Sequence, residues 1–111
     1  FSNKDDALAR RVVAHYFDTS LFALVRGALP DVPKKPAPEG TLALMQAVGA
    51  DPASTLYVGD SNVDVLTGKN AGLPCCGVLW GFRTEQELRD AGATYLAADT
   101  RQLKQVVLGQ H

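Results

Sequence analysis

Two aspartates, Asp60 and Asp64, follow a short apolar run and are the first groups in this sequence that could do chemistry. They lie in the stretch LYVGDSNVDVLTGKNAG, residues 56–72, about one helical turn apart. Paired carboxylates suit a hard cation such as Mg²⁺, which prefers oxygen ligands and bridges to phosphate groups. Asp60 and Ser61 alone could instead cap a helix, because Asp and Ser are common N-cap residues. The second carboxylate, at Asp64, favours a metal site.

A hydroxyl and an ammonium group could complete a phosphate-binding site. Ser2 follows the first predicted strand, and Lys35 lies in the loop after the second. Because the carboxyl ends of parallel strands meet at one edge of a sheet, both side chains can face the same crevice as the two aspartates. A lysine charge and a hydroxyl donor complement phosphate oxygens, as phosphoryl transfer requires. Each residue alone has an ordinary structural role, so only the combination predicts a magnesium-dependent phosphate site.

Apolar runs alternate with segments of helical periodicity along the whole sequence. We predict strands at residues 1–2, 21–27, 55–59, 73–81 and 94–97, and helices at residues 3–17, 41–50, 63–71, 85–92 and 100–109. Four prolines exclude a regular helix from the loop at residues 28–40. Continuous apolar strands, each followed by a helix, favour a parallel sheet covered on both faces. We therefore expect a doubly wound, Rossmann-like α/β fold in a single domain.

Several helix ends carry recognisable signals. Gly49, Gly72 and Gly92 stand where helices should end, as glycine often does. Thr84 and Glu87 have the spacing of a capping box and should begin the helix at residues 85–92. These signals predict where the helices between the strands begin and end.

The composition is that of an ordinary globular domain. The 111 residues are 46% hydrophobic and 21% charged, with a formal net charge of −1. Basic residues are scattered, which argues against a nucleic-acid partner, and no apolar stretch could span a membrane or serve as a signal peptide. The adjacent Cys75 and Cys76 are expected to be reduced strand residues. We expect a cytoplasmic protein of unknown oligomeric state.

The motifs in this order resemble the haloacid dehalogenase (HAD) superfamily of phosphohydrolases, and within it the phosphoglycolate phosphatase-like branch. The matching pieces are FSNK at residues 1–4, PKKPAPEG at 33–40, YVGDSNVDVLTGKNAGLP at 57–74 and GVLWGFRT at 77–84. The resemblance covers nearly the whole chain. It implies a HAD-like core and Mg²⁺-dependent hydrolysis of a small phosphorylated metabolite.

The resemblance also implies a role for each motif residue. Ser2 matches the hydroxyl that hydrogen-bonds the transferring phosphoryl group, and the neighbouring Asn3 joins it as a phosphate-binding candidate. Lys35 matches the lysine that neutralises charge on the nucleophile and the phosphate. Asp60 matches an aspartate that ligates Mg²⁺. Asp64 matches its companion, which supports either the metal's water shell or the lysine.

The sequence departs from the family pattern at its first motif. No Asp-x-Asp occurs in these 111 residues, although the family takes its nucleophile and general acid from that motif. The cap domain that selects the substrate is absent too. We therefore expect residues 1–111 to be the C-terminal portion of a HAD-like core, without the nucleophile strand and inactive alone. The missing strand should lie between the strands that end at Ser2 and Gly59. The strand edges there should therefore be paired with another segment, rearranged or exposed.

Other functions stay open at this point. A β-phosphoglucomutase, a phosphonatase or a dehalogenase would share the core and differ in the cap. A non-enzymatic or vestigial binding module, such as a receiver domain, also uses carboxylates, a hydroxyl and a lysine at strand ends. In a receiver the lysine comes late, whereas Lys35 precedes Asp60 here. A dinucleotide-binding module is weaker still, because no Gly-x-Gly-x-x-Gly follows any strand.

Overall fold

The computed structural model describes residues 1–18, 20 and 22–109. Three parallel strands form one sheet in the order β1-β2-β3, with β1 at Tyr57–Gly59, β2 at Cys75–Val78 and β3 at Tyr95–Ala97. The helices are α1 (Asp6–Tyr16), α2 (Glu39–Val48), α3 (Asn62–Asn70), α4 (Glu85–Ala91) and α5 (Thr100–Val107), with a short 3₁₀ helix, η2 (Pro52–Ser54). None of the helices in these residues is long and apolar enough to cross a membrane.

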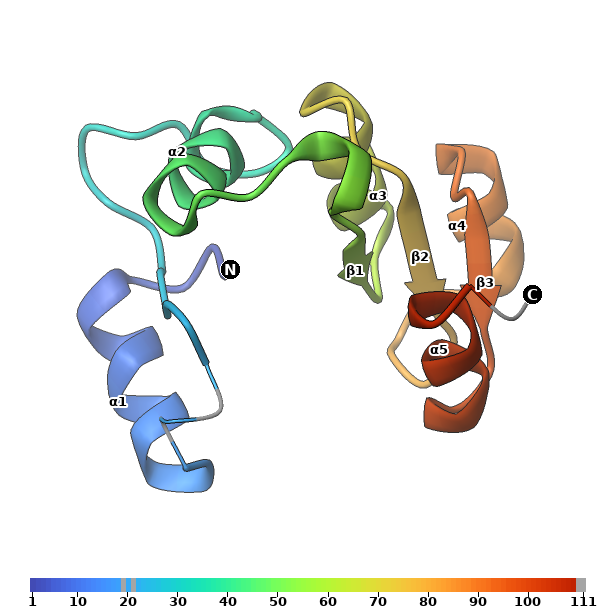
Figure 1. Cartoon of the computed structure of the whole chain (residues 1–111), viewed down its shortest axis with the longest axis horizontal. Helices are drawn as coiled ribbons and strands as arrows, with labels where there is room; N and C mark the ends of the chain where they lie inside the picture. The colour runs from blue at the N-terminus through green and yellow to red at the C-terminus, as the bar shows by residue number, and fades with distance from the viewer. Residues whose placement is uncertain (19, 21, 110–111) are drawn as a thin grey trace.

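The sheet is covered on both faces, as the apolar strands predicted. Successive strand side chains point to opposite faces, so Cys75 packs with Val65 and Leu88 beneath α3 and α4. Cys76 packs with Ala97 on the other face, beneath α5 (Figure 1). Both cysteines are buried and free, which confirms that they are reduced strand residues.

The prediction of two further strands, at residues 1–2 and 21–27, is wrong for the residues that the structure describes. Residues 1–2 and 22–27 form no strand, and Leu21 lies outside the described residues. The two segments nevertheless lie side by side, because the Ser2 amide donates to the Arg26 carbonyl at 3.1 Å. A single parallel bridge joins Asp5 to Ala28. The physical reason is that an apolar run becomes a strand only where a neighbouring strand satisfies its backbone groups.

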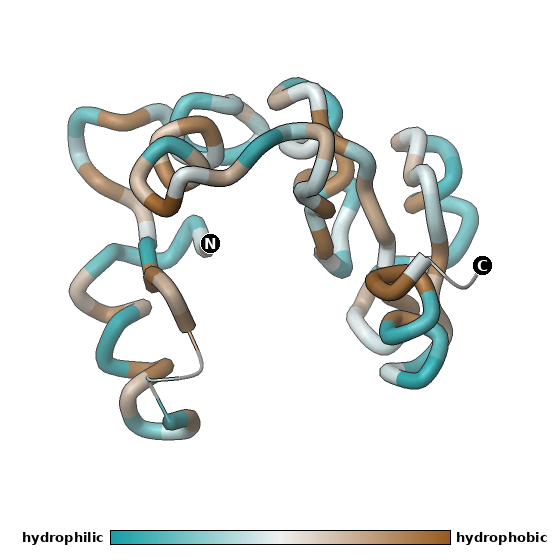
Figure 2. Tube along the Cα trace, viewed as in Figure 1, coloured by the Kyte–Doolittle hydropathy of each residue, from teal (hydrophilic) through white to brown (hydrophobic). Residues whose placement is uncertain are grey.

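β1 is an edge strand of the sheet in the described part of the chain, because it pairs there only with β2. Beyond that edge lies a hollow of about 280 Å³ whose mostly apolar lining includes Phe1, Leu24, Met45 and Tyr57. α1 and the segment after it stand on the far side of this hollow, across from the sheet, and α2 lies above (Figure 1). Residues 22–25 in the segment after α1 are hydrophobic (Figure 2). An open strand edge beside apolar side chains is what the departure from the family pattern predicted.

The helix ends agree with the signals in the sequence. The Thr84 hydroxyl accepts a hydrogen bond from the Glu87 amide at 3.2 Å, and α4 begins at the next residue. Gly49 ends α2 in the left-handed region at φ +69°. α2 begins at Glu39, two residues earlier than predicted, because Pro38 can stand at its N-terminus without a lost hydrogen bond.

Candidate active site

An ion pair between Lys35 and Asp64 stands at the centre of the candidate site. The Lys35 Nζ lies 2.6 Å from Asp64 Oδ1, and the two side chains are only 11% and 13% exposed. Lys35 comes from the loop before α2, whereas Asp64 lies in the first turn of α3. The fold therefore brings together two residues that are 29 positions apart, as the sequence predicted. Partial burial strengthens their attraction, because water screens the two charges less.

The second oxygen of Asp64 is also occupied. Asp64 Oδ2 accepts hydrogen bonds from the Asp60 amide at 3.2 Å and from the Ser61 hydroxyl at 3.1 Å. The Ser61 oxygen in turn caps α3 by accepting from the Asp64 amide. Of the two roles that the resemblance left for Asp64, the observed contact is with the lysine.

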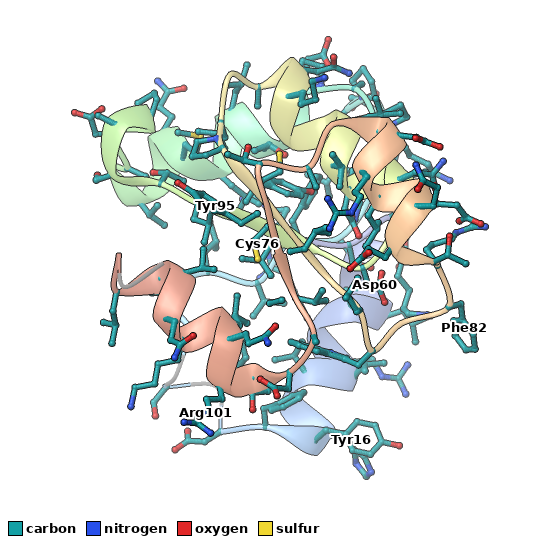
Figure 3. The ribbon with its side chains drawn as sticks, turned by 90° about the vertical axis from the view of Figure 1, so that its right-hand side faces the viewer. Tyr16, Asp60, Cys76, Phe82, Tyr95 and Arg101 are labelled. Atoms are coloured by element: carbon teal, nitrogen blue, oxygen red, sulfur yellow. The ribbon has the colours of Figure 1, made fainter. Side chains whose placement is uncertain are left out.

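The Asp60 carboxylate differs from that of Asp64, because it is exposed and accepts no hydrogen bond within the described residues. It lies against the backbone of Gly81, where an added Cβ would come within 2.5 Å of Asp60 Oδ2. The backbone of Gly59 lies equally close to the Asp64 side chain, so a Cβ at residue 59 would collide with that side chain. Asp60 follows β1 directly in the sequence, and in Figure 3 the fully exposed Phe82 points away from the ribbon.

These residues could bind a hard cation through one or two carboxylates, but not through a full set of protein ligands. No cluster of three or more His, Cys, Asp or Glu residues that could hold a metal occurs in the described part of the chain. A Mg²⁺ ion, however, keeps several waters and binds proteins through one or two carboxylates together with substrate phosphate. The free carboxylate of Asp60 meets that requirement, and Asp64 stands next to it.

Asn3 contacts the backbone of Lys35, whereas the Ser2 side chain contacts the backbone of Lys4. The Ser2 Oγ accepts a hydrogen bond from the Lys4 amide at 3.0 Å, which leaves the hydroxyl proton able to donate elsewhere. The Asn3 side chain uses both of its polar atoms on the Lys35 backbone. The structure thus joins the FSNK segment to the lysine loop.

Two aromatic residues shape the electrostatics around the ion pair. The Lys35 Nζ stands 5.8 Å from the centre of the Phe1 ring, a distance at which a cation is attracted to the ring face. Burial, followed by the negative charge of Asp64, raises the pKa of Tyr57 to about 12. Tyr57 therefore stays neutral at physiological pH.

The sequence interpretation missed the glycines that make room for the carboxylates. Gly59 precedes Asp60 directly, so its place before the first aspartate is a local signal that could have pointed to it. Gly81 carries no such signal, because it is distant in sequence from Asp60. Only the pairing of β1 with β2 brings the ends of these two strands together.

The arrangement can bind an anion and a cation side by side. The Lys35 ammonium is bonded to Asp64, whose other oxygen accepts from the Asp60 amide next to the free Asp60 carboxylate. Lysine has three N–H donors, and one of them is directed at Asp64. The others remain able to hold phosphate oxygens.

Comparison with known proteins places this arrangement in a family. Residues 32–103 match the model of the family described as HAD-hydrolase-like. This range includes the lysine loop and both aspartates.

Curated relatives have related names. The chain is 44% identical over 72 residues to the probable phosphatase IndB of Dickeya dadantii, a match that covers 65% of this chain and 31% of that protein. It is 39% identical over 70 residues to a probable phosphoglycolate phosphatase of Pseudomonas putida, covering 63% of this chain and 28% of that protein. The chain therefore spans less than half the length of these relatives.

Solved structures share the fold over almost the whole chain. A Lactobacillus delbrueckii protein assigned as a phosphoglycolate phosphatase superposes with a TM-score of 0.89 at 28% identity, over 96% of this chain and 44% of that one. A HAD-superfamily hydrolase from Geobacter sulfurreducens gives a TM-score of 0.72 at 25% identity, over 92% and 44%. These neighbours confirm the HAD-like fold.

Proposed function

This chain belongs to the HAD-hydrolase-like family, and on that premise we propose that the full-length protein is a Mg²⁺-dependent phosphatase acting on a small phosphomonoester. The proposal includes a substrate resembling phosphoglycolate, because that name recurs among the relatives. A cytoplasmic location is part of the proposal, supported by the two free cysteines.

The observation that carries the proposal is the largely buried Lys35–Asp64 ion pair beside the free carboxylate of Asp60. A lysine held only by solvent would bind phosphate weakly, because its long side chain would have to be ordered on binding. Here Asp64 and the Phe1 ring have already fixed the ammonium group. Catalysis of phosphoryl transfer depends mostly on such positioning and charge stabilisation.

Each residue has a specific task in this proposal. Lys35 donates to phosphate oxygens and neutralises their charge, while Asp64 holds its ammonium in place. Ser2 donates its hydroxyl proton to the transferring group. Asp60 is the residue that holds Mg²⁺, with Asp64 adjacent, and the bound ion supplies charge neutralisation at the phosphate.

The nucleophile is not among these residues. In the proposed mechanism a carboxylate from an Asp-x-Asp motif attacks phosphorus, the P–O bond to the alcohol breaks, and the general acid of the same motif protonates the leaving oxygen. No such motif occurs in the 111 residues. The 111-residue polypeptide alone should therefore give no turnover, since covalent catalysis needs its nucleophile.

The test is hydrolysis of p-nitrophenyl phosphate by the full-length protein with and without Mg²⁺. Asp60→Asn keeps the shape of the side chain and removes its charge, so it should abolish the Mg²⁺-dependent activity. Asp90→Asn is the matched control, because Asp90 lies exposed on α4 and contacts Gln86. Unchanged activity in Asp60→Asn would overturn the assigned metal role. No phosphatase activity in the unaltered full-length protein would leave a non-enzymatic binding module as the better description.

A further inference from the structure

We propose that Asn3 is a positioning residue that holds the backbone of Lys35, so that the ammonium group of this lysine meets the phosphate. This inference rests on the proposed function, and it assigns to the Asn3 side chain a task other than direct phosphate binding.

The first step is the geometry of the contact. The Lys35 amide donates to Asn3 Oδ1 at 2.9 Å, and Asn3 Nδ2 donates to the Lys35 carbonyl at 3.3 Å. A carboxamide that pairs with both polar groups of one residue fixes the orientation of that residue as well as its distance. Both bonds are partly buried and join residues 32 positions apart.

The second step is that Asn3 is itself anchored. The residues on either side of it are bonded to the segment after α1, through the Ser2 amide on the Arg26 carbonyl at 3.1 Å and the Ala28 amide on the Lys4 carbonyl at 2.7 Å. Asn3 therefore presents its amide from a fixed support, and Lys35 takes its position from that support.

The third step is that both polar atoms of the Asn3 side chain are already used. A direct bond from Nδ2 to a phosphate would have to compete with the Lys35 carbonyl. The Lys35 side chain, in contrast, ends on Asp64 at 2.6 Å with donors to spare. A change at Asn3 should thus reach the phosphate through Lys35.

Asn70 offers a natural comparison on the other side of the same loop. Its Nδ2 donates to the carbonyl of Pro36, the residue after the lysine, at 2.9 Å. This is a single exposed bond, and it contacts no backbone group of Lys35. Asn70→Ala is therefore the matched control for Asn3→Ala.

The activity test uses the full-length protein with p-nitrophenyl phosphate. Asn3→Ala should lower kcat roughly tenfold to a hundredfold, because misplacing a catalytic group by about 1 Å has effects of that order. Asn70→Ala should change kcat less than about twofold. Asn3→Asp keeps the volume and the acceptor but loses the donor, so it should also lower kcat if Asn3→Ala fails to fold.

A double-mutant cycle separates positioning from a general structural role. Its readout is the binding of inorganic phosphate in the presence of Mg²⁺, followed by ³¹P NMR, which does not require turnover. Asn3→Ala and Lys35→Met should each weaken phosphate binding, and Asn3→Ala should add no more than about twofold in the Lys35→Met background. Equal effects of Asn3→Ala in both backgrounds would overturn the proposal and assign Asn3 to direct phosphate contact or to general stability.

Amide hydrogen exchange tests the contact independently of any phosphatase activity. The Lys35 amide should exchange roughly fivefold faster in Asn3→Ala, the change expected from losing one hydrogen bond, and at its normal rate in Asn70→Ala. Unchanged Lys35 exchange in Asn3→Ala would overturn the positioning role. Absence of phosphatase activity in the unaltered protein, by contrast, would overturn the proposed function while this exchange measurement still reports on the contact.

Discussion

The two halves of this molecule differ in how their apolar side chains pack. In the sheet half, residues 56–107, side chains on both sheet faces pack into buried clusters that include Val65, Cys75, Cys76 and Leu88. In the N-terminal half, residues 1–50, the large side chains of Leu8, Tyr16, Phe17 and Phe22 remain 42–72% exposed. Among the described residues of the N-terminal half, no strand ladder brings these side chains together.

The difference shows that apolar character alone does not make a strand. Residues 22–25 are apolar throughout, as β2 is, yet among the described residues only β2 has a paired strand on each side. The open edge of β1 and the hollow beside it mark where a further strand would join the two halves.

The candidate site lies where the halves meet. Asn3 and Lys35 come from the N-terminal half, and Asp60 and Asp64 come from the sheet half. The Lys35–Asp64 ion pair is therefore also a contact between the halves, so the site depends on their relative position.

The largest expected effect is a loss of stability when a buried side chain of the sheet half is truncated. Leu88 is fully buried in the sheet half, so Leu88→Ala should lower the free energy of unfolding by about 2–5 kcal/mol. Leu8 is 46% exposed on α1, and Leu8→Ala should cost less than about 1 kcal/mol. Urea unfolding of the full-length protein measures both. Equal losses would break the contrast between the halves.

A smaller effect is expected from the helix caps. Thr84→Ala removes the hydroxyl that accepts from the Glu87 amide and should lower the free energy of unfolding by about 1 kcal/mol. Asp5 caps α1 through a longer bond of 3.4 Å to the Leu8 amide. Asp5→Ala should therefore shift the urea midpoint less than Thr84→Ala does. The reverse order would mean that α1 contributes more to global stability than its exposure indicates.

A further effect appears only at high pH. The pKa of Tyr57 is raised to about 12, above the value of about 10 for an unfolded tyrosine. The unfolded chain therefore loses this proton first, so the free energy of unfolding should fall as the pH rises from about 10 to about 12, and the contribution is complete below pH 10. Tyr57→Phe should flatten this fall, measured by urea unfolding at several pH values. Tyr16→Phe, at a side chain that is 72% exposed, is the control and should leave the slope unchanged.

Much of the sheet half could be predicted from the sequence, because its signals are local. The runs at 55–59, 73–81 and 94–97 each contain an observed strand, and Thr84 and Gly92 bound α4 as expected. The rule that parallel strands end at one edge predicted that Lys35 and Asp64 could face one crevice, although the strand expected before the Lys35 loop does not form. The resemblance left contact with the lysine as one of two roles for Asp64. The roles of Ser2, Asn3, Lys35, Asp60 and Asp64 in catalysis and binding stay predictions.

The sequence by itself determined the three strands of the sheet half, the ends of several helices and the reduced cysteines, and it predicted which residues bind metal and phosphate. These depend on neighbours within a few positions along the chain. Only the tertiary structure decided that residues 22–27 form no strand, that Asn3 holds Lys35 and that Gly81 makes room for Asp60. These outcomes depend on groups distant in sequence, whose approach is set by strand pairing and packing and leaves no local pattern.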